Sequence, residues 1–161
     1  MKKTLLLLLV ISFFSCNNQS EKNLLLFNNV SFALLQNEKI SNITSIEKDK
    51  FFSHFNEQAQ QIPMYKCIKG DAYTVYIALP FNTTIQELCA ADFIVCDQDV
   101  LTPIEASEYY YKKYKCVDRF VSEYAISIDN NIVYVLATTS LESVADSLFS
   151  YEAIKNRFVI K

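Results

Sequence analysis

The feature that most limits what this chain can fold into is its glycine content, because Gly70 is the only glycine in 161 residues. Phosphate-binding loops, dinucleotide-binding turns and nucleophile elbows need glycines at fixed offsets, so none of them can be built here. Gly70 lies between two extended apolar runs, residues 64–68 and 72–79. We therefore expect a β-hairpin with Lys69-Gly70-Asp71 as its turn, where glycine supplies the positive φ.

A second hairpin is predicted nearer the C-terminus. Residues 123–128 and 132–137 are strand-like runs separated by Asp129-Asn130-Asn131, a typical turn composition. Residues 30–35 are expected to form a strand after a turn at Asn28-Asn29, with a helix as the alternative for this stretch. Short strands are also expected at residues 93–96 and 157–160. The predicted class is α+β: an antiparallel sheet built from two hairpins, packed by three to four helices.

Four segments carry helix signals. Thr44 and Glu47 match a capping box, and an apolar face of Phe51, Phe52, Phe55, Ala59 and Ile62 follows before Pro63. Residues 83–91 are expected to form a short helix. Thr102-Pro103-Ile104-Glu105 is the strongest helix start, and this helix is expected to continue through Val121. Thr139-Ser140-Leu141-Glu142 opens the last predicted helix.

The N-terminus is typical of an export signal. Two lysines precede an uninterrupted apolar run, Leu5 to Ile11, which is shorter than the ~20 residues that cross a bilayer. Phe13-Phe14-Ser15-Cys16 resembles the lipobox of bacterial lipoproteins, with Phe13 where leucine is usual. The resemblance implies removal of residues 1–15 and lipidation of Cys16. The alternative is an ordinary cleaved signal in which this cysteine is unmodified.

The remaining chain divides into a polar tether, residues 16–23, and one domain, residues 24–161. Removing residues 1–15, which hold two lysines and no acid, changes the net charge from −3 to −5. Nucleic-acid binding is therefore not expected, because it needs basic residues that displace phosphate counterions. The predicted location is the cell envelope, where the lipid anchor binds the domain to a membrane on the periplasmic side or at the cell surface.

Four cysteines are left once Cys16 is assigned to the lipid. An even number in an oxidising compartment predicts two disulfides, with the pairing open. A metal site is disfavoured, because no pair has zinc-knuckle spacing and His54 is the only histidine. Unpaired buried thiols are the other alternative. The candidates are Cys67, Cys89, Cys96 and Cys116.

Candidate chemical sites are few. His54 is expected at a helix edge rather than in a Cys–His or Ser–His–Asp site. Asp97 and Asp99 lie in an acidic stretch that departs too far from the EF-hand pattern, which leaves a looser calcium site or a solvated loop. No catalytic residue, metal ligand or cofactor is assigned. A hydrolase would need two of the acids Asp92, Asp97, Asp99, Glu105 and Glu108.

An interface is the remaining candidate. If residues 102–121 are helical, Tyr110 and Tyr114 point inward and Tyr111, Lys112 and Lys115 outward, where tyrosine beside lysine suits a protein or membrane contact. The alternative is a core helix with solvated lysines. Together with Asp97 and Asp99, these residues form the candidate interface. The expected function is a non-catalytic protein-binding module, an immunity or inhibitor protein or an accessory subunit. The alternatives are a small hydrolase and a purely structural lipoprotein.

Overall fold

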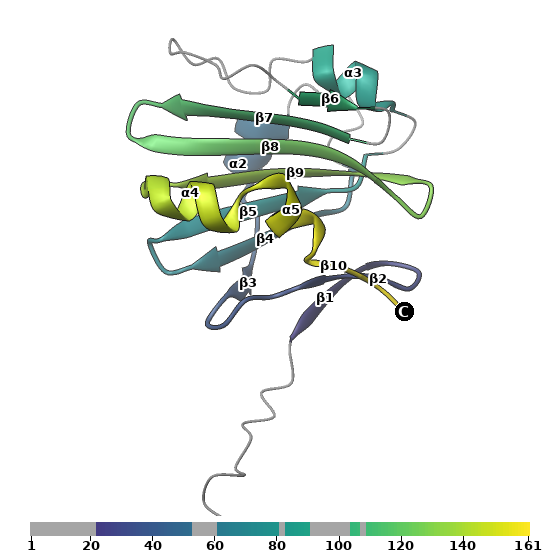
Figure 1. Ribbon diagram of the computed structural model, residues 1–161. Coiled ribbons are helices and arrows are strands. Elements are labelled where there is room, and N and C mark those ends of the chain that lie inside the picture. Colours follow the sequence, from purple (N-terminus) through teal and green to yellow (C-terminus); the bar gives the residue numbers. More distant parts are fainter. Residues whose placement is uncertain (1–21, 53–60, 81–82, 91–103, 107–108) are drawn as a thin grey trace, which may run out of the picture.

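The computed structural model describes residues 22–52, 61–80, 83–90, 104–106 and 109–161, with the side chains of residues 51–52, 89–90 and 104–106 also outside the description. The elements, shown in Figure 1, are β1 (Asn23–Phe27), β2 (Val30–Ala33), β3 (Lys39–Ser41), α2 (Ser45–Phe52), β4 (Met64–Lys69), β5 (Tyr73–Ala78), α3 (Ile85–Ala90), β6 (Ile104–Ala106), β7 (Tyr109–Cys116), β8 (Arg119–Ile128), β9 (Asn131–Thr139), α4 (Glu142–Leu148), α5 (Tyr151–Lys155) and β10 (Phe158–Ile160). No helix in these ranges is long and apolar enough to cross a membrane.

The strands form two antiparallel sheets. The large sheet has seven strands in the order β3-β4-β5-β9-β8-β7-β6, and the small sheet has three in the order β1-β2-β10. The two predicted hairpins, β4–β5 and β8–β9, meet through the pairing of β5 with β9. The expected antiparallel sheet with helices is therefore confirmed, but the sheets are larger and the helices shorter than the sequence indicated.

The central strand β9 is buried on both faces of the large sheet. Val133, Val135 and Ala137 point to one side, and Tyr134 and Leu136 point to the other, all with exposed fractions of 0%. Other elements must pack on both faces of such a strand, because removing an apolar surface from water lowers the free energy of the folded state. The rest of the chain supplies the two covers.

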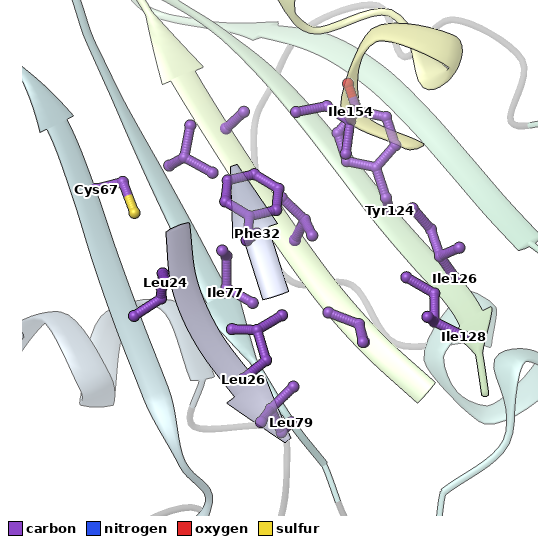
Figure 2. Close-up of a cluster of buried hydrophobic side chains, with 14 of the residues drawn as sticks. Leu24, Leu26, Phe32, Cys67, Ile77, Leu79, Tyr124, Ile126, Ile128 and Ile154 are labelled. Carbon is purple, nitrogen blue, oxygen red and sulfur yellow. The ribbon is translucent and has the colours of Figure 1, made fainter. Parts of the chain in front are cut away.

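The small sheet, α4 and α5 cover one face, which we call the front face (Figure 1). Leu24, Leu26 and Phe32 of the small sheet and Ile154 of α5 pack with the large-sheet residues in one core cluster (Figure 2). Alternation along β1 explains this cover, since Leu24 and Leu26 are buried while Leu25 between them is exposed.

α2 and α3 cover the opposite face, which we call the back face. Ile85 and Leu88 of α3 pack in a second core cluster with Tyr134 and Leu136. The predicted capping box of α2 is confirmed: Glu47 N–H donates to Thr44 Oγ1 at 3.2 Å, and Thr44 N–H donates to Glu47 Oε2 at 2.9 Å. Glu47 also reaches the sheet, where Lys66 Nζ and the Tyr76 hydroxyl donate to its Oε1 at 2.5 and 2.8 Å.

Three turns of the structure are formed by Gly, Asn or Asp residues with positive φ, the residue types that favour such turns. Gly70 has φ +52° in the β4–β5 turn, as predicted. Asp129 and Asn130 have φ of 49° and 59° between β8 and β9, and two positive φ values identify a type I′ hairpin turn. Asn28, with φ 44°, lies in the turn between β1 and β2. Residues 30–33 are therefore a strand, as expected, and not the alternative helix.

The predicted helix from Thr102 to Val121 is wrong in its described part. Residues 109–116 form β7, which pairs with β8 along its whole length, and residues 104–106 form β6. Tyr110 and Tyr114 are buried on the back face, as helical spacing and strand alternation both allow. Tyrosine favours strands, and pairing with β8 satisfies the backbone of this segment. Thr102 and Pro103, like the strand predicted at 93–96, lie outside the described residues.

The expectation that all four cysteines pair is also wrong. Cys67 is a free thiol in the middle of β4, fully buried in the front core cluster (Figure 2). It behaves as a small apolar side chain there. Cys116, at the end of β7, is disulfide-bonded. The side chains of Cys89 and Cys96 lie outside the described residues.

Arg157 links several of the segments that cover the front face. Its Nη2 donates to Glu38 Oε2, and its Nε donates to the Ala33 carbonyl at 3.0 Å. The guanidinium lies over the Phe32 ring, 4.0 Å from the centroid. Both charged side chains are nearly inaccessible, with exposed fractions of 5% and 0%. One residue thus joins β10, β2 and the loop that leads from β2 to β3.

Replacing Arg157 by alanine is predicted to lower the free energy of unfolding by about 3 to 5 kcal/mol, because Glu38 would remain buried without its counter-charge. Urea unfolding followed by circular dichroism measures the change. Lys155→Ala, which removes an exposed cation from α5, is the matched control and should cost about 0.5 kcal/mol. Equal effects of the two variants would contradict the role given to Arg157.

Glu47 predicts a pH dependence of stability. Partial burial alone would raise its pKa, but the Lys66 ammonium and hydrogen bonds from Thr44 and Tyr76 outweigh it and lower the pKa from 4.5 to about 2. A depressed pKa in the folded state means that the ionised group stabilises the fold above pH 4.5 and loses this contribution as the pH falls towards 2.

We therefore expect Glu47→Gln to be less stable than the wild type by about 1 kcal/mol at neutral pH, a modest value because the pair is partly hydrated. The difference should shrink between pH 4.5 and 2. Thermal unfolding across this range measures it, and a gap that is constant with pH would contradict the assignment.

Candidate functional site at the loop end of the large sheet

Three chain connections meet at one end of the large sheet. The register places Thr139, the last residue of β9, opposite both Tyr73 of β5 and Phe120 of β8. The β4–β5 turn, the β7–β8 turn and the β9–α4 connection therefore lie side by side (Figure 1, left). We call this surface the loop end and define it as residues 70–72, 117–118 and 140–141.

Thr139 connects two of these segments through its hydroxyl group. The hydroxyl donates to the Ala72 carbonyl at 2.8 Å and accepts from the Leu141 backbone N–H at 3.1 Å. Thr139 itself is fully buried. Two of the three segments of the loop end are thus held together, and a preformed surface has a lower ordering cost for binding.

Val117 is the most unusual residue of the loop end. It occupies the first position of the two-residue turn between Cys116 and Arg119, with φ +55°. Type II′ hairpin turns place glycine there, because a β-branched side chain is strained at positive φ. The side chain gains no burial in return, since Val117 is 80% exposed. Strain without compensating packing is characteristic of functional positions.

Leu141 adds a second apolar side chain to the loop end. It is 50% exposed and precedes α4 as its N-cap, although leucine cannot accept the hydrogen bond that Ser or Asp would. Charged residues surround the two apolar side chains: Asp71, Lys115, Asp118 and Arg119 are all exposed. Apolar side chains within a charged rim are the usual composition of a protein-binding patch.

The back face contains a buried carboxyl group, that of Glu123, which we considered as a candidate catalytic group. Glu123 of β8 is fully buried there, and the Tyr114 hydroxyl donates to its Oε1. Burial and the charge of Glu123 raise the pKa of Tyr114 and of Tyr134. Both hydroxyls therefore stay protonated at neutral pH, and that of Tyr114 donates a hydrogen bond to Glu123. The Glu123 side chain is thus held inside the core and is not accessible to a substrate.

The free thiol of Cys67 is equally unsuited to catalysis. Burial raises its pKa to about 12, and the nearby charge of Glu38 adds to the effect. A thiol becomes a nucleophile only as the thiolate, which is scarce at neutral pH in this setting. No group of three His, Cys, Asp or Glu side chains in the described ranges is arranged to hold a metal ion.

The structure separates the residues of the predicted interface. Tyr111 lies half-buried on the front face, stacked on Tyr124 with ring centroids 5.0 Å apart. Lys112 lies on the back face, with its ammonium 5.3 Å from the centroid of the Tyr114 ring. Lys115 is exposed and borders the loop end. Asp97, Asp99 and His54 lie outside the described residues, so the acidic part of that interface stays a prediction.

Sequence reasoning missed the roles of Val117 and Leu141. It also placed the start of the last helix at Thr139, which is wrong, because Thr139 is the last residue of β9 and Leu141 is the N-cap of α4. A two-residue turn without Gly, Asn or Pro gives no turn signal, and a helix was expected through Val117. Tyr110 and Tyr114 share a face in a helix and in a strand, so their spacing gave no signal that the chain turns at Val117. The role of Thr139 depends on strand register, which sequence pattern alone did not give.

Thr139→Val is predicted to lower the free energy of unfolding by about 1 to 2 kcal/mol, because the isosteric side chain leaves Ala72 and Leu141 without their partner. Hydrogen exchange at Leu141 should also become faster. Thr138→Val, at the neighbouring position on the other face of β9, is the matched control and should leave that exchange rate unchanged. If both variants leave it unchanged, Thr139 does not hold the loop end.

Comparison of the chain with protein-family models, with curated proteins and with solved structures found no match.

Proposed function

We propose that this chain is a membrane-anchored envelope lipoprotein that acts as a non-catalytic protein-binding module, either an immunity or inhibitor protein or an accessory subunit. The loop end is the surface that meets the partner. The observation that carries this proposal is Val117, an exposed β-branched residue held at positive φ beside the exposed Leu141. Neither side chain contributes to the core, and Thr139 fixes the backbone around Leu141.

The interior supports a binding role over an enzymatic one. The carboxylates of Glu38 and Glu123 are buried and engaged by Arg157 and Tyr114, and Glu47 is bound by Lys66. The Cys67 thiol is buried and protonated at neutral pH. A carboxylate hydrolase remains the alternative proposal, and cleavage of envelope glycans or peptides by the purified chain would favour it.

The proposed anchor is the lipid on Cys16, and it has its own test. Cells that express the full chain are labelled with a fatty acid analogue, with Cys16→Ser as the control. We expect label on the wild-type protein and none on the variant. An unlabelled wild-type chain would show that the protein is secreted without a lipid.

Val117→Gly is predicted to separate stability from binding. Glycine relieves the strain at positive φ and should raise the free energy of unfolding by about 1 kcal/mol. The same change removes an exposed apolar contact and should weaken partner binding at least about tenfold if Val117 is a central contact. Chemical unfolding measures the first effect.

The second effect is measured by recovering envelope proteins cross-linked to the full chain. Ile46→Ser is the matched control, because Ile46 is 76% exposed on α2, away from the loop end. A partner retained by Ile46→Ser and lost by Val117→Gly and by Leu141→Ser supports the proposal. A partner that all three variants retain would place the interface elsewhere.

A further inference from the structure

The small sheet has an outer face that none of the described elements covers, although Ser31 at its centre is buried between its neighbours, with an exposed fraction of 5%. Its inner face packs on the large sheet through Leu24, Leu26 and Phe32. Across the outer face, Leu25 of β1, Ser31 of β2 and Val159 of β10 form one row in register. Leu25 is 63% exposed, although it is a large apolar residue in the middle of a strand.

The charge of this part of the molecule is opposite to that of the whole. Residues 22–34 and 158–161 contain two lysines, Lys22 and Lys161, and no acidic residue, whereas the chain as a whole has net charge −3. Both lysines are exposed. The tether contributes one acid, Glu21. An apolar side chain beside lysines is the composition that suits the surface of an anionic membrane.

The length of the chain before β1 limits how far this face can lie from the anchor. Lys22 is the sixth residue after Cys16, and a fully extended chain covers about 3.5 Å per residue, so Lys22 lies within about 20 Å of the proposed lipidated residue. The Lys22 carbonyl accepts from the Leu34 N–H at 2.9 Å, which fixes the end of the tether to the small sheet. The sheet that the tether enters is therefore the part of the domain held nearest the membrane.

We propose that the outer face of the small sheet lies on the lipid surface, with Leu25 in the interface and Lys22 and Lys161 at anionic headgroups. This inference rests on the lipid anchor of the proposed function. Contact through this face sets the orientation of the domain. β7 and β8 lie on the side of the large sheet far from the small sheet, and the turn between them projects sideways (Figure 1), so a protein can reach it when the small sheet lies on the lipid.

The absence of tryptophan from the chain allows a direct test. Leu25→Trp, Asn23→Trp and Val117→Trp each place one tryptophan in the full lipidated protein. Leu25 and Asn23 lie on the outer face, and Val117 at the loop end is the control. The proteins are reconstituted in vesicles of phosphatidylethanolamine and phosphatidylglycerol, with and without bromine on the acyl chains, and circular dichroism verifies the fold.

We expect blue-shifted emission that brominated lipid quenches for Leu25→Trp, and no quenching for Val117→Trp. Asn23→Trp serves if Leu25→Trp does not fold. Adding Lys22→Glu and Lys161→Glu to Leu25→Trp should reduce the quenching, as should vesicles of phosphatidylcholine alone.

Flotation of the vesicles separates the two proposals. Wild-type protein that does not float with the vesicles contradicts the anchor. Protein that floats with unquenched tryptophan at both outer-face positions overturns the surface contact and leaves the anchor standing. Blue-shifted emission without lipid quenching also overturns it and indicates a second protein chain on this face.

Discussion

The β8–β9 hairpin and its neighbour β5 form a sheet centre that is apolar on both faces, and most other elements lie where they do because those faces must be covered. On the front face the cover is made from the two ends of the domain, β1 and β2 from the beginning and α4, α5 and β10 from the end. This layer forms only when these segments, which are far apart in the sequence, pack against one another. Arg157 fixes how these segments pack, since its guanidinium contacts Glu38, the Ala33 carbonyl and the face of Phe32.

The same constraint explains why the buried carboxylates and the thiol of the described residues are engaged within the protein. A sheet covered on both sides buries whatever polar groups its strands carry, and each then needs a partner inside the protein. Glu123 is engaged by a tyrosine hydroxyl, Glu38 by an arginine, and Cys67 packs as an apolar residue. Residues that are free to meet another molecule lie instead at the ends and edges of the sheets. Val117 and Leu141 are at one end of the large sheet, and Leu25 is on the uncovered face of the small one.

Sequence predicted several local features correctly, failed for the helix predicted from Thr102 to Val121 and for the helix start placed at Thr139, and indicated little of the long-range pairing. Gly70, the Asp129-Asn130 turn and the Thr44–Glu47 capping box each act within a few residues, and the structure confirms all of them. The segment from Tyr109 to Cys116 fitted both a helix and a strand, because Tyr110 and Tyr114 share a face in either. Its pairing with β8 decided the matter, and pairing is not a local property. The loop end was missed for the same reason, since it exists only once the register of β5, β8 and β9 brings three connections together.

The central claim is that this molecule acts through its loop end and not through its interior. Amide hydrogen exchange of the full chain, with and without a protein partner recovered by cross-linking, tests it most directly. The account predicts slower exchange at residues 70–72, 116–119 and 140–141 in the complex, and unchanged exchange along α3 and the strands of the back face. Slower exchange confined to the back face, with the loop end unaffected, would contradict it.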